Sequence, residues 1–185
     1  MEHISDKVIL GIDPGTTIMG YGAIHAQGKN PVLVDMGIVD LRKCKDHYLK
    51  LQIIYEKTVG LVDRFKPDEV AIEAPFYGKN VQSMLKLGRA QGVAIAAAIS
   101  RDVPVFEYAP RKIKMAITSV GTASKEQVAA MLARMFNIDV LPKNLDATDG
   151  LAAAVCHFYQ KGPHTKNSST KSWEDYIRKN PGRVK

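Results

Sequence analysis

Residues 8–24 read VILGIDPGTTIMGYGAI, two short apolar runs separated by a polar turn that begins at Asp13. Short apolar runs bounded by turn residues are typical of buried β-strands, and Asp-Pro-Gly is a strong turn signal. The pattern predicts a β-hairpin with strands over 8–12 and 19–24. Asp is a poor strand residue, so an Asp at the end of a buried strand indicates either a turn cap or a functional carboxylate.

Further along the chain, helices alternate with strands. A third strand is predicted over 32–41, which completes an antiparallel meander. Apolar residues then recur at helical spacing from Tyr48 to near Pro67. The remaining elements are expected as strands over 70–74 and 103–108, and as helices over 81–100, 111–119, 124–136 and 146–159. We therefore expect an α/β fold with a mixed five-stranded sheet, in which parallel strands join the meander and helices cover both faces.

Length and composition indicate one globular domain. The 185 residues are enough for one core, which we place in residues 1–160, and the polar, basic segment 161–185 is expected to be flexible. The sequence has no run of about 18 apolar residues, and its start lacks the apolar stretch of a signal peptide. Its two cysteines are too few for a disulfide framework. We expect a cytoplasmic protein that does not associate with membranes.

The net charge of +7 is concentrated in two blocks. Residues 76–125 sum to +6 and residues 161–185 to +5, whereas residues 1–75 and 126–160 each sum to −2. Basic blocks beside acidic ones are typical of proteins that bind polyphosphate while holding metal ions, although solvated lysine-rich faces give the same count. Nucleic acid is therefore one candidate ligand.

Four acidic residues stand where chemistry is expected. Asp13 and Glu73 each end an apolar strand, and an unpaired buried carboxylate is costly. Asp146 and Asp149 lie three residues apart at the start of the last helix, so they share one of its faces. Helix capping, with Asp146 as the N-cap, would also explain this pair. The small apolar run over 150–155 predicts that the helix packs closely on the sheet and directs its acidic start inward.

With no basic residue beside them, the four carboxylates would repel one another strongly at neutral pH. Divalent cations relieve such repulsion. Oxygen ligands suit Mg²⁺, with Mn²⁺ as a substitute, and two such ions about 4 Å apart can activate a water and stabilise the leaving oxygen in phosphoryl transfer. The acids therefore predict a site for two metal ions.

Four stretches of the chain, in this order, resemble the RuvC family of bacterial Holliday junction resolvases, which have an RNase H-like fold. They are GIDPGTTIMGYGAI (11–24), AIEAPFYGKNVQSMLKLGRAQGVAIAAA (71–98), VFEYAPRKIKMAI (105–117) and DATDGLAAAV (146–155). The resemblance implies that the metal-binding catalytic residues are the same four acids: Asp13, Glu73, Asp146 and Asp149. It also implies that Phe76 contacts DNA bases at the junction and that Lys114 and Lys125 bind DNA near the active site, at the scissile phosphate.

The resemblance further implies an activity and partners. The enzyme would be a crossover junction endodeoxyribonuclease, a phosphodiester hydrolase that resolves Holliday junctions in DNA recombination and repair. It would nick two strands of equal polarity symmetrically and leave 5′-phosphate and 3′-hydroxyl ends. It would act as a homodimer, with the branch-migration proteins RuvA and RuvB as partners. Gly88, Gly92 and Ala96 form a small-residue stripe that would allow close approach of a second copy, or of the chain's own sheet.

Other functions share parts of this pattern. The four acids alone also suit an RNase H-like nuclease that acts on structured RNA. Asp-Pro-Gly-Thr-Thr after a strand also resembles the phosphate loop of actin-like kinases and ATPases, but those need two such domains, and the sequence holds no second phosphate loop. A non-catalytic junction-binding protein is disfavoured, because four acids facing phosphate would only weaken its binding.

Overall fold

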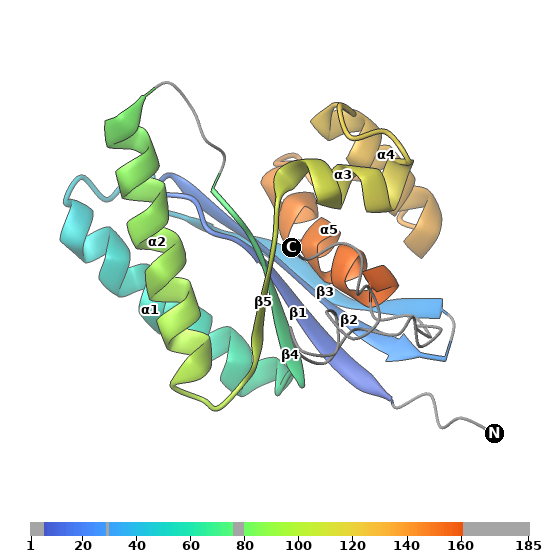
Figure 1. Cartoon of the computed structure of the whole chain (residues 1–185), viewed down its shortest axis with the longest axis horizontal. Coiled ribbons are helices and arrows are strands. Elements are labelled where there is room, and N and C mark those ends of the chain that lie inside the picture. Colours follow the sequence, from blue (N-terminus) through green and yellow to red (C-terminus); the bar gives the residue numbers. More distant parts are fainter. Residues whose placement is uncertain (1–5, 29, 76–79, 161–185) are drawn as a thin grey trace, which may run out of the picture.

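The computed structural model describes residues 6–28, 30–75 and 80–160. Its elements, shown in Figure 1, are β1 (Lys7–Asp13), β2 (Ile18–Gln27), β3 (Asn30–Asp40), α1 (His47–Phe65), β4 (Glu69–Glu73), α2 (Val81–Ile99), β5 (Val105–Tyr108), α3 (Pro110–Thr118), α4 (Lys125–Phe136) and α5 (Asp146–Gln160). Every predicted element is present, and most ends differ by one or two residues. The strand β2 runs on to Gln27 because its last residues continue the ladders with both neighbouring strands.

The sheet is mixed, as predicted, with the strand order β3-β2-β1-β4-β5. The meander of β1, β2 and β3 is antiparallel, whereas β4 lies parallel to β1 and β5 lies parallel to β4. Because β1 and β4 are parallel neighbours with Ile12 opposite Ile72, both strands end at the same edge of the sheet.

Helices cover both faces of the sheet, which confirms the predicted layers (Figure 1). One core lies under α1 and α2 and contains alternate residues of the central strands, such as Leu10, Ile12, Val70 and Ile72. The other lies under α5, with α3 and α4 packed beside it, and contains the intervening residues Ile9 and Ala71. The two cores follow from the two-residue period of a β-strand.

The helix α5 packs unusually close to the sheet. A Cβ atom at Gly11 of β1 would stand 2.0 Å from the backbone oxygen of Gly150, so only glycine permits this contact. The small apolar residues of α5 therefore lie directly on the strands, as the sequence predicts.

The segment 161–185 lies outside the described residues. Among the helices that the structure describes, none is long and apolar enough to cross a membrane.

Candidate active site

Asp13 and Glu73 lie at the same edge of the sheet, at the ends of two adjacent strands. Each is the last residue of its strand, β1 or β4. Side chains alternate along a strand, and the Cβ position of Gly11 faces α5, so Asp13 points to the same helix two residues later. Ala71 lies in the core under α5, and the same alternation directs Glu73 to that helix.

The first turn of α5 brings Asp146 and Asp149 to these strand ends. Gly20 lies opposite Asp13 in the ladder of β1 and β2, and a Cβ on Gly20 would stand 1.9 Å from the backbone oxygen of Asp146. The alternative role of Asp146 as the N-cap is wrong. Its own backbone N–H donates to Asn144 Oδ1 (3.0 Å), so Asn144 supplies the accepting side chain at this helix end.

The pKa values show that these acids act on one another. Burial, followed by the charge of Asp149, raises the pKa of Asp13 to about 7. Burial, followed by the charge of Asp13, raises the pKa of Glu73 to about 8. Burial also raises the pKa of Asp149, although Lys125 opposes this. Positive charge placed among these groups would favour their ionised forms, so the site attracts cations.

Lys125 supplies such a charge, which corrects the expectation that no basic residue accompanies the acids. Its Nζ atom forms ion pairs with Asp146 and, at 2.6 Å, with Asp149. Burial lowers the pKa of Lys125, but the hydrogen bonds to these two carboxylates outweigh burial and raise it. Lys125 is the first residue of α4, whose start is fixed by the predicted capping box of Ser124 and Gln127.

All four acidic side chains offer carboxylate oxygens, which are the ligands that a hard divalent cation prefers. The ammonium of Lys125 already lies between Asp146 and Asp149, so this part of the site holds a positive charge. Within residues 6–28, 30–75 and 80–160, no three Asp, Glu, His or Cys side chains converge closely enough to hold one ion. Asp146 and Asp149 are instead paired with Lys125, and a metal ion would compete with this lysine for them.

Lys114 faces the same acids from α3. Its charge lowers the pKa of both Glu73 and Asp149, in opposition to burial. The structure thus brings Lys114 and Lys125 to the acids from two different helices. Phe76, predicted to contact DNA, lies outside the described residues.

Two basic residues, Arg42 just after β3 and Lys50 in the first turn of α1, also lie near the site and were not predicted there. Arg42 donates to Asp40 through Nε (2.9 Å) and Nη2 (2.6 Å), and this hydrogen bonding raises its pKa, with a further contribution from Asp146. Lys50 Nζ donates to the backbone oxygen of Thr16 at 2.8 Å, in the loop that joins β1 to β2. No sequence signal marks Arg42, whereas Lys50 stands out because it places a cation in the first turn of a helix.

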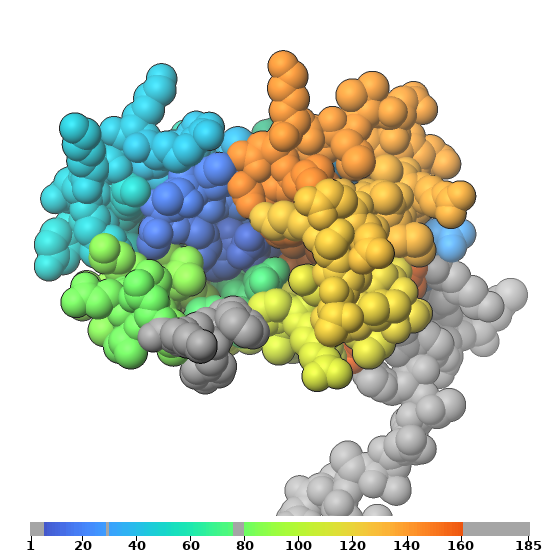
Figure 2. All heavy atoms as spheres, turned by 90° about the horizontal axis from the view of Figure 1, so that it is seen from above, coloured from blue at the N-terminus to red at the C-terminus, as the bar shows by residue number. Residues whose placement is uncertain are grey.

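Figure 2 shows how these parts surround the strand ends. Seen from above, the blue surface of the β1–β2 hairpin lies near the centre, with the cyan start of α1 on one side. The yellow and orange surfaces of α3, α4 and the start of α5 lie on the other side. Arg42 and Lys50 belong to the segment that leads into α1 and forms its first turn, and Lys114 and Lys125 belong to α3 and α4.

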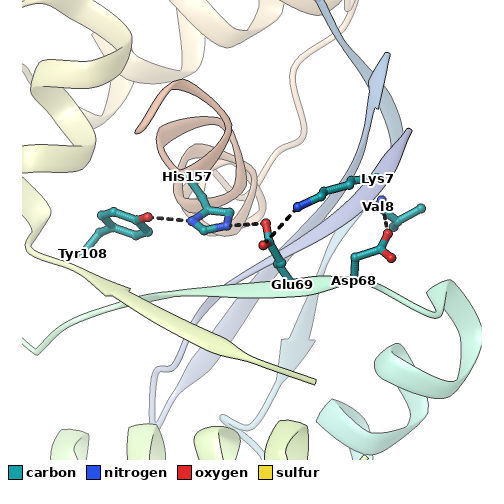
Figure 3. Close-up of polar contacts among 6 residues, drawn as sticks. All are labelled: Lys7, Val8, Asp68, Glu69, Tyr108 and His157. Atoms are coloured by element: carbon teal, nitrogen blue, oxygen red, sulfur yellow. Dashed lines mark hydrogen bonds and ion pairs between the residues drawn. The ribbon is translucent and has the colours of Figure 1, made fainter. Parts of the chain in front are cut away.

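A second polar cluster lies toward the other end of α5 (Figure 3). The fully buried His157 lies between the Tyr108 hydroxyl (2.6 Å from Nδ1) and Glu69 Oε2 (2.9 Å from Nε2). Because an ionised carboxylate can only accept, Nε2 donates to Glu69, and Nδ1 is the ring nitrogen that meets the Tyr108 hydroxyl. Lys7 adds an ion pair to Glu69 at 3.3 Å. Each of these polar side chains has a partner.

The chain is similar to known proteins over nearly its whole length. A family model described as crossover junction endodeoxyribonuclease RuvC matches residues 9–157. The protein of that name from Christiangramia forsetii is 60% identical over 98% of this chain and 94% of its own length. The one from Bacteroides fragilis is 59% identical over 100% of both chains. Among solved structures, Thermus thermophilus RuvC in complex with a Holliday junction substrate has a TM-score of 0.76 and 31% identity, over 83% of this chain and 94% of its own.

Proposed function

This chain belongs to the RuvC family of crossover junction endodeoxyribonucleases, and from that premise we propose which of its residues resolve a Holliday junction. It is a Holliday junction-resolving endonuclease of DNA recombination, a hydrolase of a metal-dependent family, with an RNase H-like fold. One observation supports the location of the active site: four carboxylates from three elements lie near enough to one another at one sheet edge to influence each other's pKa values, beside two lysines.

We propose that the catalytic, metal-binding residues are these four acids: Asp13, Glu73, Asp146 and Asp149. Support comes from the pKa values of Asp13 and Glu73, which are raised to about 7 and about 8 and which bound cations would lower. When bound, two divalent ions supply an activated water and stabilise the leaving 3′ oxygen. An all-oxygen donor set favours Mg²⁺, with Mn²⁺ as a substitute.

Lys114 and Lys125 are proposed to hold the scissile phosphate. Lys125 forms ion pairs with both Asp146 and Asp149 and offsets part of their charge. Divalent ions held by these carboxylates would compete with Lys125 for them, and its ammonium would then be available to a phosphate oxygen, where charge develops during cleavage. Phe76 is assigned to base stacking at the junction from the family resemblance.

We propose that two copies associate through α2. A Cβ atom at Gly88 or Gly92 would meet no atom within 4 Å, so these two glycines do not serve packing on the chain's own sheet. Val81 and Leu85 are exposed on the same helix face. A second copy on this face would give a symmetric pair of active sites, as needed to nick two strands of equal polarity and leave 5′-phosphate and 3′-hydroxyl ends.

The cellular setting is part of the same proposal. RuvA and RuvB are the proposed partners, because a resolvase acts on junctions that branch-migration proteins move. The proposed location is the cytoplasm, because the relatives are bacterial proteins and the bacterial chromosome lies in the cytoplasm.

Cleavage of an end-labelled synthetic four-way junction tests this function. Linear duplex and an RNA–DNA hybrid serve as controls, each with Mg²⁺, with Mn²⁺ or with a chelator. We expect paired, symmetric nicks that are confined to the junction and require the divalent ion. Cleavage of the hybrid alone would assign the site to an RNA substrate. Tight junction binding without cleavage would indicate a non-catalytic junction-binding protein.

A further inference from the structure

The loop that follows Asp13 is held in place by hydrogen bonds from other parts of the chain. Residues 14–17 join β1 to β2, and in the described part of the chain no backbone hydrogen bond links two of these four residues. Leu41 N donates to Thr17 O at 2.9 Å, and Lys50 Nζ donates to Thr16 O at 2.8 Å. A loop without internal hydrogen bonds depends on such contacts for a single conformation.

Lys50 is an unfavourable residue for its own helix. It is the fourth residue of α1, in a first turn that contains no acidic residue. A cation at a helix N-terminus is repelled by the partial positive charge of the helix dipole. Among the described residues, no carboxylate forms an ion pair with Lys50. The nearest carboxylate along the helix is that of the N-cap Asp46, and the Lys50 ammonium donates to Thr16 O rather than pairing with it, which points to a role outside the helix.

The start of α1 gives Lys50 a fixed base from which to reach the loop. The side chain of Asp46 caps the helix and accepts from the backbone N–H of Leu49 at 2.7 Å. The half-buried side chain of Lys50 then spans to Thr16, which is 34 residues earlier in the chain. Two separate parts of the fold are therefore joined by this one ammonium group.

We propose that Lys50 is a positioning residue of the active site, whose ammonium fixes the loop 14–17 and thereby the direction in which Asp13 faces the other acids. The inference rests on the proposed function, because it assigns Asp13 to catalysis. Asp13 is the last residue of β1, so any movement of the loop acts directly on its backbone. Misplacing a reacting group by about 1 Å can slow a reaction roughly 100-fold.

The Leu41 amide provides a readout that does not depend on activity. Its hydrogen bond to Thr17 O breaks whenever the loop moves away, so its hydrogen exchange reports the loop's conformation. Lys50→Met removes the ammonium and keeps most of the apolar stem. Lys57→Met is the matched control, because Lys57 is an exposed lysine of the same helix. Lys50→Arg tests whether another cationic donor restores the contact.

We expect Lys50→Met to accelerate exchange at Leu41 about tenfold, with exchange at the buried Ile54 of α1 unchanged. Lys57→Met should leave both rates unchanged. The thermal midpoint of Lys50→Met should be equal to or above that of the wild type, because the repulsion from the helix dipole is removed. Unchanged exchange at Leu41, or faster exchange throughout α1 with a lowered midpoint, would overturn the proposal.

Single-turnover cleavage of a four-way junction supplies the second measurement. Lys50→Met should cleave roughly ten- to 100-fold more slowly, while its junction Kd stays within about twofold of Lys57→Met. Lys50→Arg should recover at least half of the wild-type rate. A wild-type rate in Lys50→Met would overturn the proposal. If the wild-type protein cleaves no junction, the proposed function fails, and the exchange at Leu41 alone decides whether Lys50 fixes the loop.

Discussion

The helix α5 carries a polar cluster toward each end, and the two clusters are balanced differently. At its start, Asp146 and Asp149 join Asp13 and Glu73, and the acids outnumber the lysines that face them. About 16 Å further along the helix, His157 bonds to Tyr108 and Glu69, and Glu69 also pairs with Lys7 (Figure 3). Both clusters lie between the same helix and the same face of the sheet.

This difference in charge balance indicates that the cluster around His157 stabilises the fold, whereas the cluster at the start of α5 serves function. Buried polar groups stabilise a protein only when they are paired, and the cluster around His157 meets that condition. The surplus of carboxylates at the start of α5 destabilises the metal-free protein, and such a surplus is typical of a site that binds a cation. We therefore expect the first cluster to control activity and the second to control stability.

The largest effect is expected from Asp13→Asn, which removes one charge from the surplus. Junction cleavage should fall by roughly 1,000-fold or more, because a metal ligand is lost, while junction affinity changes only a few-fold. Single-turnover rates and Kd values measure both quantities. Glu69→Gln, in the paired cluster, is the control and should cleave within about threefold of the wild type. Cleavage by Asp13→Asn within tenfold of wild type would remove Asp13 from the site.

Glu69→Ala tests the paired cluster around His157 by its effect on stability rather than on cleavage. It leaves His157 and Lys7 without their shared carboxylate, so the free energy of unfolding should fall by about 3 kcal/mol. Urea denaturation measures this. Asp13→Asn should be as stable as the wild type, or more stable, under the same metal-free conditions. Equal urea midpoints for Glu69→Ala and wild type would show that the paired cluster does not stabilise the fold.

The surplus of carboxylates also predicts a pH dependence of stability without divalent ions. The pKa values of Asp13 and Glu73 are raised on folding to about 7 and about 8, so the folded state binds more protons than the unfolded state. The free energy of unfolding should therefore fall as pH rises from about 4 to about 8. Thermal midpoints at pH 5.5 and 8.5 measure it, and Asp13→Asn should flatten the slope. A midpoint that rises with pH in this window would contradict the prediction.

The smallest effect is expected from Tyr108→Phe. The change removes the hydroxyl that bonds to His157 Nδ1 and keeps the ring, so it should cost about 1 kcal/mol of unfolding free energy. Cleavage should stay at the wild-type rate, because the cluster is remote from the acids. Tyr159→Phe is the control for losing a hydroxyl, because Tyr159 is an exposed tyrosine of α5 whose hydroxyl makes only a long contact of 3.8 Å to Met135 Sδ. A slowed cleavage in Tyr108→Phe would show that the two clusters are coupled through α5.

Much of the fold follows from local pattern. The apolar runs on either side of Asp-Pro-Gly predict β1 and β2 because strands have a two-residue period and the turn residues end them. The capping box of Ser124 and Gln127 predicts the start of α4 because it involves only neighbouring residues. Asp13 and Glu73 were marked by the anomaly of a carboxylate at the end of a buried strand.

The rest of the candidate site depends on contacts between distant residues. Lys125 meets Asp146 and Asp149 only because α4 and α5 are packed side by side, and the sequence indicates no such pairing. The alternative role of Asp146 as an N-cap is excluded by Asn144, two residues earlier, whose side chain accepts from the Asp146 backbone N–H. Lys50 and Thr16 come together across 34 residues, which no periodicity reports.

The sequence by itself determined the elements, the mixed sheet and the four acids at strand ends and a helix start. These features depend on backbone geometry and on burial, and both appear in the sequence as the local spacing of apolar and turn residues. Only the tertiary structure decided which acids are paired and which remain in surplus. That balance depends on side chains from separate elements, whose distances are set when α5 packs on the sheet through Gly11 and Gly20. Electrostatic energy depends on those distances and on exclusion of water, and neither quantity is contained in the order of residues along the chain.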